Sequence, residues 1–311
     1  MSVDSRISIK GGKRSRFLLG FGIVVILAAS IFIVMGFFSK LFNQKNEETK
    51  QSIANQSTPA HREEWTVYLS TINNNRVGSI VVDLGLRNVA PITNRPNLLS
   101  FSLTMNSPGS EGLSSAEESD TLNQIEEAIT KSLEEKHGAV YAGHLNAEGK
   151  LRSYYYFGET SHHEKTISEV MAIFPQYKFE YKLTDDKSWQ TYFEILYPLP
   201  IQMQSIQNAG VVRSLQKSGD KLEKKRQVDH WIYFKTEADR ENFLVTIKGK
   251  GFKVINKEFV GELEVMPFKL RIARDDKVDH RSVDEYVLDL WQIAQDCNGD
   301  YDGWETSIVR D

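Results

Sequence analysis

Apolar positions follow three different patterns along the chain, and each pattern predicts a different kind of structure. Residues 17–38, FLLGFGIVVILAASIFIVMGFF, carry no charge, and as a helix they would extend about 33 Å, enough to cross the core of a bilayer. Residues 43–62 are polar and aperiodic, which predicts a linker. From Trp65 onward, alternating and helical patterns follow one another, which predicts folded α+β structure.

The first folded region is predicted to span residues 63–200. Two alternating segments, WTVYLS and SIVVDLGL, flank a run of asparagines and predict a hairpin of strands. From residue 98 onward the pattern predicts β-α-β-β-α-β, the ferredoxin-like order. The first helix of this series is predicted to begin at a capping box, Ser115 with Glu118. It is predicted to bury one stripe, consisting of Leu122, Ile125, Ile129 and Leu133.

The second folded region, residues 201–311, is predicted to repeat this order. The strand VDHWIYFK is followed by a helix capped by Thr236, a hairpin, a helix with the capping box Ser282–Glu285, and the final strand YDGWETSIV. The predicted fold class is therefore α+β: an N-terminal single transmembrane helix followed by two α+β domains, each with β-α-β-β-α-β order.

The charges that flank the apolar segment predict an orientation in a membrane. Five basic residues precede it, and three follow it within a comparable distance: Arg6, Lys10, Lys13, Arg14 and Arg16 before, and Lys40, Lys45 and Lys50 after. By the positive-inside rule, residues 1–16 are a basic cytoplasmic tail, residues 17–42 are the membrane anchor, and the body lies outside. The predicted location is the bacterial inner membrane, single-pass, with a cytoplasmic body as the alternative.

Composition excludes several classes of function for the body of the chain, residues 43–311. Of the 311 residues, 40% are hydrophobic and 26% are charged, as in folded globular proteins. Residues 1–42 carry six basic residues and one acid, so the net charge of −4 for the whole chain leaves −9 for residues 43–311. An acidic body is not expected to bind nucleic acid directly, and it suits a basic protein partner. The single cysteine, Cys297, excludes an internal disulfide and a zinc site built from cysteines.

The segment NGDYDGWET, residues 298–306, resembles the start of a calcium loop. Counted from Asn298, positions 3, 5 and 6 fit an EF-hand, but position 12, which must supply a bidentate glutamate, is Val309. No metal site is therefore predicted. The alternation predicts a strand in which Tyr301 packs inward, the acids face water and Gly303 permits a bulge.

No catalytic residue, cofactor or metal ligand is predicted elsewhere either. His162 and His163 are adjacent in a turn and lack the spacings of metal-binding histidines, and the common hydrolase and nucleotide-binding motifs are absent. Two alternatives stay open. One is an uncharacterised hydrolase or metal-dependent enzyme in the first region that uses His162, His163 and nearby acids, and the other is a structural envelope protein.

Both folded regions resemble known families. The second region resembles the regulator of ribonuclease E activity B family through four segments in the same order: LQKSGD, RQVDHWIYF, GKGFKV and GDYDGWE. This resemblance implies an acidic, non-enzymatic protein that binds ribonuclease E and damps RNA decay in the cytoplasm, whereas the charge bias places this body outside. The first region resembles the domain-of-unknown-function 695 family through SIVVDLGL, AVYAGHL, SYYYFG and WQTYFEILYP, which implies no chemistry.

The predicted function is that of a membrane-anchored, non-enzymatic regulatory protein that binds a protein partner. The partner is ribonuclease E-like and basic if the body is cytoplasmic, and residues 17–42 contact the membrane. The surface predicted to meet the partner combines exposed aromatics with acids from two strands. Its residues are Asp229, His230, Trp231, Tyr301, Asp302, Trp304 and Glu305. The sequence leaves the oligomeric state open.

Overall fold

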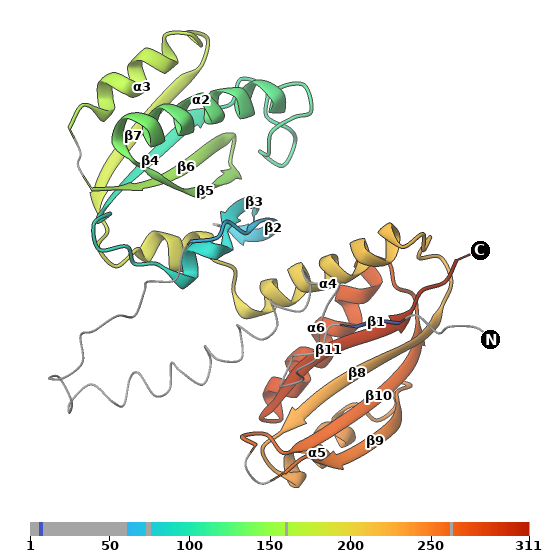
Figure 1. Ribbon diagram of the computed structural model, residues 1–311. Coiled ribbons are helices and arrows are strands. Elements are labelled where there is room, and N and C mark those ends of the chain that lie inside the picture. The colour runs from blue at the N-terminus through green and yellow to red at the C-terminus, as the bar shows by residue number, and fades with distance from the viewer. Residues whose placement is uncertain (1–5, 9–60, 73–75, 159–160, 262–263, 311) are drawn as a thin grey trace, which may run out of the picture. The chain divides into compact units, whose positions relative to one another are not determined.

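The computed structural model describes residues 6–8, 61–72, 76–158, 161–261 and 264–310. These residues form two compact units, each with one antiparallel sheet (Figure 1). The unit within residues 53–202 is called the first unit here. The C-terminal unit comprises residues 203–311 together with the short strand β1 (Arg6–Ser8).

The sheet of the first unit has six strands in the order β2-β3-β5-β6-β4-β7. Its strands are β2 (Trp65–Ile72), β3 (Arg76–Asp83), β4 (Asn97–Thr104), β5 (Val140–Ala147), β6 (Lys150–Phe157) and β7 (Lys178–Asp185). Its helices are α2 (Ser119–His137) and α3 (His163–Met171), with short helical turns η2 (Leu84–Asn88) and η3 (Tyr192–Leu196). From β4 to β7 the order is β-α-β-β-α-β, and β2 and β3 extend this sheet beyond β5.

Helices α2 and α3 lie on one face of the sheet of the first unit (Figure 1). The stripe predicted for α2 is confirmed, since its buried residues are Leu122, Ile125, Ile129 and Leu133. They pack against β4 and β6 because positions three or four apart share one face of a helix. Gly138, in the left-handed region with a φ of 58°, ends the helix.

The opposite face of this sheet is closed by the segment that contains η3. Trp189 stacks on Tyr156 of β6 with 3.9 Å between ring centroids, and both side chains are fully buried. The hydroxyl of Tyr192 donates to the carbonyl of Asp83 at 2.9 Å, which ties η3 to the end of β3. The first unit is therefore packed on both faces where β3, β5 and β6 run.

The sheet of the C-terminal unit has the order β1-β11-β8-β10-β9. Its strands after β1 are β8 (Arg226–Phe234), β9 (Lys253–Phe259), β10 (Phe268–Asp276) and β11 (Gly299–Ser307). Its helices are α4 (Pro200–Lys217), α5 (Glu237–Thr246) and α6 (His280–Asp296). From β8 to β11 the order is again β-α-β-β-α-β. Three residues of the predicted basic tail form β1, which pairs antiparallel with residues 305–307 of β11.

Each sheet contains a bulge beside a glycine. In β11, Tyr301 pairs with Ile232 and Gly303 pairs with Trp231, so Asp302 is an extra residue. Gly303 has a φ of 124°, a conformation that other residues rarely adopt. The bulge predicted at this glycine is confirmed. In β5, a Cβ on Gly143 would lie 2.1 Å from the carbonyl oxygen of Val81, so only glycine fits there.

The predicted fold class and localisation need a correction. The anchor predicted for residues 17–42 lies outside the described residues, and no helix within the described ranges is long and apolar enough to cross a membrane. The described helices are amphipathic: α2, for example, buries one stripe and exposes charged residues on its other sides. The single-pass inner-membrane assignment thus finds no support here, and the fold is mixed α+β with two sheets.

Candidate functional site

The seven residues predicted to meet a partner lie on β8 and β11 but on two different faces of the sheet. His230, Tyr301 and Trp304 belong to the hydrophobic core or contact it, on the side covered by the helices. Asp229, Trp231, Asp302 and Glu305 lie on the opposite side, because Glu305 pairs with Asp229 and Gly303 pairs with Trp231. The bulge at Asp302 makes this division possible, since it turns Trp304 back into the core.

The three core residues have structural partners. Nδ1 of His230 lies 2.7 Å from the hydroxyl of Tyr301, and the histidine ring packs edge-on against Phe252 and Tyr286. Burial, together with the nearby positive charge of Arg274, lowers the pKa of His230 to about 3. Nε1 of Trp304 donates to the side-chain oxygen of Asn208 on α4 at 3.0 Å. The hydrogen-bonded structural role is thus the one that the geometry gives to these side chains.

The opposite side of β8, β10 and β11 carries a cluster of acids around Trp231, which we call the carboxylate face. Its residues are Asp229, Trp231, Tyr233, Lys269, Arg271, Asp300, Asp302 and Glu305. Nε of Arg271 donates to Asp229 at 3.0 Å, and its guanidinium lies 5.2 Å from the centroid of Trp231. Arg271 therefore contacts both the ring of Trp231 and the carboxylate of Asp229.

Charge on the carboxylate face is predominantly negative. Four carboxylates stand against two basic side chains, and Glu305 is directly opposite Asp229 in the ladder. The hydrogen bond to Asp229 raises the pKa of Arg271. Burial raises the pKa of Asp300 to about 6 and, with the charges of Asp302 and Glu258, raises the pKa of Tyr233 to about 12. The face is a region of concentrated negative potential.

The inward packing predicted for Tyr301 is confirmed, whereas the exposure predicted for the aromatics and acids of this surface is wrong. None of them exceeds 9% exposure, and the acids expected to face water, Asp302 and Glu305, are buried. The accessible rim of the carboxylate face consists of other residues: Tyr233, Lys269, Arg271 and Asp300 are each half-buried. Whether the predicted residues contact a partner stays a prediction.

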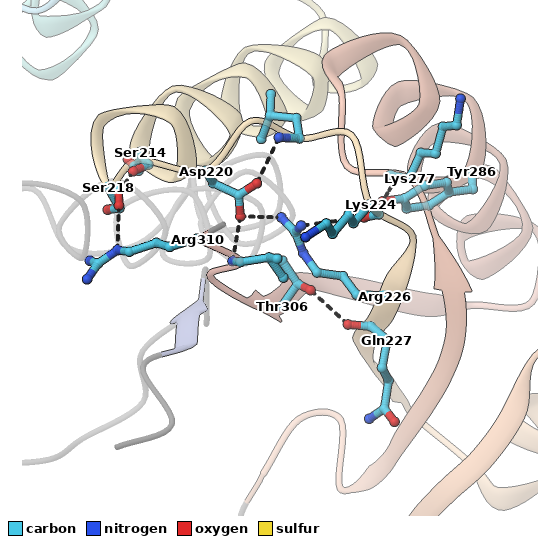
Figure 2. Close-up of polar contacts among 12 residues, drawn as sticks. Ser214, Ser218, Asp220, Lys224, Arg226, Gln227, Lys277, Tyr286, Thr306 and Arg310 are labelled. Carbon is cyan, nitrogen blue, oxygen red and sulfur yellow. Dashed lines mark hydrogen bonds and ion pairs between the residues drawn. The ribbon is translucent and has the colours of Figure 1, made fainter. Parts of the chain in front are cut away.

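A buried ion pair that sequence reasoning missed holds the end of β11 in place (Figure 2). Oδ2 of Asp220 accepts from Arg226 at 2.6 Å and from the backbone N–H of Val309 at 2.9 Å, and Oδ1 accepts from the N–H of Leu222 at 2.8 Å. Nε of Arg310 donates to the carbonyl of Ser218 at 2.8 Å. The loop after α4 and the chain beyond β11 are thus fastened to each other.

The histidines of the alternative enzyme hypothesis are not brought together as a site. His163 is buried between Phe157 and Tyr181, with centroid distances of 6.0 and 5.9 Å, whereas His162 is exposed. Among the residues that the structure describes, no group of three histidine, cysteine or acidic side chains could hold a metal ion. The geometry around His162 and His163 is that of a helix start packed on aromatic rings.

The first unit contains another polar cluster that sequence reasoning missed, centred on Glu126 of α2. Its carboxylate is hydrogen-bonded to the hydroxyl of Tyr141 at 2.7 Å, Nδ1 of His144 at 2.9 Å and the hydroxyl of Ser153. Although burial opposes ionisation, the contacts with His144, Ser153 and Tyr141 lower the pKa of Glu126. Ser153 donates to the carboxylate and not to the histidine, so the cluster is not arranged as a nucleophile with its base.

Replacing Glu126 by glutamine should lower the free energy of unfolding of the first unit by about 2 kcal/mol, because one oxygen that accepts hydrogen bonds becomes a donor. Chemical denaturation with urea would measure this. Glu127→Gln, at an exposed position of the same helix, is the control and should change stability by less than about 0.5 kcal/mol. Equal effects of the two substitutions would show that the cluster is energetically neutral.

Comparisons with known proteins agree with the two resemblances seen in the sequence. Residues 63–197 match the model of a family of unknown function, DUF695, and residues 205–306 match the model of the family described as regulator of ribonuclease activity B. Both resemblances are therefore confirmed, in the predicted order. No curated protein matches the chain.

Among solved structures, the chain is similar to an unknown protein from Galdieria sulphuraria, with 10% identity, a TM-score of 0.20 and coverage of 69% of this chain and 99% of that one. It is also similar to a protein described as a glycine cleavage system transcriptional repressor, with 10% identity, a TM-score of 0.19 and coverage of 69% and 98%. At these TM-scores neither likeness supports an argument about fold or function.

Proposed function

We propose, from the match of residues 205–306 to the regulator of ribonuclease activity B family, that this chain is a non-enzymatic regulator of ribonuclease activity. It acts by binding a protein partner through its C-terminal unit, and the partner is a ribonuclease E-like endonuclease. The observation that carries the proposal is this family match. The carboxylate face supplies a surface whose chemistry suits such a partner.

The partner segment that fits the carboxylate face is basic. The acids beside Trp231 outnumber the cations of the face and set a negative potential, and at the half-buried rim Tyr233 and Asp300 offer an aromatic and a carboxylate next to Lys269 and Arg271. Arginine side chains suit such a rim, because a guanidinium can stack on an aromatic ring and pair with a carboxylate at the same time. Electrostatic attraction would speed the encounter and weaken as salt is added.

Cleavage of RNA by a purified ribonuclease E-like enzyme, measured with increasing amounts of this chain, tests the proposal. We expect the chain to slow cleavage, and the variant Asp300→Asn with Glu305→Gln to require at least about a tenfold higher concentration for the same effect. Asp300→Asn alone is a second test variant that keeps the buried Glu305 in place.

The matched control removes two acids far from the carboxylate face, at exposed positions of α2: Glu127→Gln with Glu135→Gln. It should inhibit as the unmodified chain does, and circular dichroism should show that it and the test variants are folded at the temperature of the assay. Unchanged cleavage in the presence of the unmodified chain would overturn the proposed function. If the test and control variants weakened inhibition equally, the carboxylate face would not be the surface that binds the ribonuclease.

A further inference from the structure

A cavity lies in the C-terminal unit on the side of the sheet that carries the helices. It has a volume of about 640 Å³ and is lined by the turn before β9, the end of β10 and residues 282–289 of α6. Arg274, which lines it, pairs with the core residue Val228, so the cavity and the carboxylate face are on opposite sides of the sheet. Its size is within the range of cavities that hold small molecules.

The cavity presents a guanidinium group that is held in one position. The guanidinium carbon of Arg274 lies 4.1 Å from the ring centroid of Phe252, which supports one of its faces. In the plane of the group, Nε donates to Asp276 at 2.7 Å and Nη1 donates to the carbonyl of Lys250 at 2.7 Å. A guanidinium fixed in this way has a second flat face on which a planar ring can stack.

Two lysines next to this group line the same cavity and are exposed, Lys225 and Lys277. Lys225 precedes β8, Lys277 follows β10, and the last rung between these strands pairs Arg226 with Asp276, so the two lysines are close in the fold. In the part of the chain that the structure describes, neither lysine forms an ion pair. Like charges placed close together repel each other, and an anion between them relieves this repulsion.

Most of the acids that line the cavity are already paired. Asp276 accepts from Arg274, and Asp289 lies 2.9 Å from the ammonium group of Lys250. Glu285 is the exception, since it is exposed and has no ion pair among the described residues. The charges that remain for a ligand are therefore those of two lysines against one glutamate, which favours an anion.

We propose that this cavity binds a nucleoside monophosphate, with the phosphate between Lys225 and Lys277 and the base stacked on Arg274. The two ammonium groups suit a doubly charged phosphate, and the fixed guanidinium suits a flat base. An inorganic anion would leave both the guanidinium face and most of the volume unused. Because the carboxylate face lies on the other side of the sheet, this proposal and the proposed action on a ribonuclease stand or fall separately.

Isothermal titration calorimetry of the full chain with AMP, inorganic phosphate and adenosine tests the site. AMP is expected to bind with a Kd of about 0.1 mM, and each of the other two probes at least about tenfold more weakly, because each carries only one of the two groups recognised. Inorganic phosphate that binds as tightly as AMP would contradict the stacked base. Adenosine that binds as tightly as AMP would contradict the phosphate position.

Removing the two lysine charges gives the first test variant. Lys225→Gln with Lys277→Gln should raise the Kd for AMP by about tenfold or more. The matched control, Lys182→Gln with Lys235→Gln, removes two exposed lysines outside the cavity and should leave this Kd unchanged. Glu285→Gln should act in the opposite direction and lower the Kd by about twofold to threefold, because it removes a repelling charge.

Arg274→Lys separates stacking from charge. This variant keeps the positive charge but loses the flat group, so it should weaken AMP by about fivefold or more and inorganic phosphate far less. Circular dichroism checks that each variant is folded. A chain that binds none of the three probes at millimolar concentrations would overturn the proposal. So would AMP binding that the lysine variant leaves unchanged, or that the control variant weakens to the same extent, because the nucleotide would then lie elsewhere.

Discussion

Replacing Asp220 by alanine should lower the free energy of unfolding of the C-terminal unit by about 3–5 kcal/mol. The Asp220 and Arg226 side chains are 1% and 7% exposed, so removal of the carboxylate leaves a buried guanidinium without its partner. Two backbone N–H groups, those of Leu222 and Val309, lose their acceptor as well. Because the guanidinium left behind is buried, water cannot replace the hydrogen bonds that it loses, and most of the destabilisation remains.

Urea denaturation followed by tryptophan fluorescence measures the effect, and hydrogen exchange assigns it to the C-terminal unit. A matched double variant, Asp220→Leu with Arg226→Met, removes both charges and should recover part of the lost stability. Asp289→Ala, which breaks the exposed pair with Lys250, should cost less than about 1 kcal/mol. If Asp220→Ala were no worse than Asp289→Ala, the buried network would not be what fastens the loop after α4.

Replacing His230 by phenylalanine should change how the stability of the C-terminal unit depends on pH. The pKa of His230 is about 3 in the folded chain and about 6.5 in an unfolded one. Below pH 6.5 the imidazole of His230 binds a proton in the unfolded state but not in the folded state. This histidine therefore lowers the stability of the folded chain as the pH falls. Between pH 8 and pH 4 the cost is about 3 kcal/mol.

Asp300 acts in the opposite direction, so the two titrations must be separated. Its raised pKa of about 6 makes the folded state bind a proton before the unfolded state does, which adds stability as the pH falls through 6. The test therefore compares chains that share Asp300. The stability of His230→Phe minus that of the unmodified chain should increase by about 3 kcal/mol from pH 8 to pH 4.

The loss of the hydrogen bond to Tyr301 in His230→Phe is the same at every pH and cancels in this comparison. Asp300→Asn supplies the complementary control, because it removes the opposing titration and leaves the histidine. That variant should lose stability in acid more steeply than the unmodified chain. A difference between His230→Phe and the unmodified chain that does not vary with pH would show that His230 titrates normally.

Local patterns predicted the elements that depend on local contacts. The stripe on α2 follows from spacing alone, and the cap at Thr236 is as predicted, since its hydroxyl accepts from the N–H of Asp239. The two capping boxes were not found. Glu118 accepts from the backbone of Asn106 and Ser107, which lie in a loop before the helix. Sequence spacing cannot tell whether a carboxylate serves its own helix or a neighbouring loop.

The second predicted capping box, Ser282 with Glu285, is absent for a related reason. The helix α6 begins three residues earlier than predicted, because Asp279 accepts from the N–H of Ser282 and so takes the capping position. Asp, Ser and Glu near a helix start can all serve as caps, and packing of the helix decides between them.

The candidate site was predictable in part. Alternation placed His230 and Trp231 on opposite faces, and the structure agrees. Exposure was not predictable, because it depends on what covers a sheet face and not on the strand itself. The pair of Asp220 with Arg226 was also beyond the sequence pattern: its third partner, Val309, is 89 residues away, and nothing local marks such a contact.

The bulge at Asp302 has a consequence for the length of this strand. In a regular strand, Tyr301 and Trp304 would point to opposite sides, since they are three positions apart. The extra residue brings both into the core, where each is at most 4% exposed. The run Tyr-Asp-Gly-Trp-Glu therefore supplies its own side chains and also determines which face of the sheet each later side chain of the strand occupies. Chemical replacements within it act locally, whereas deletion of one residue would turn every later side chain of the strand inside out.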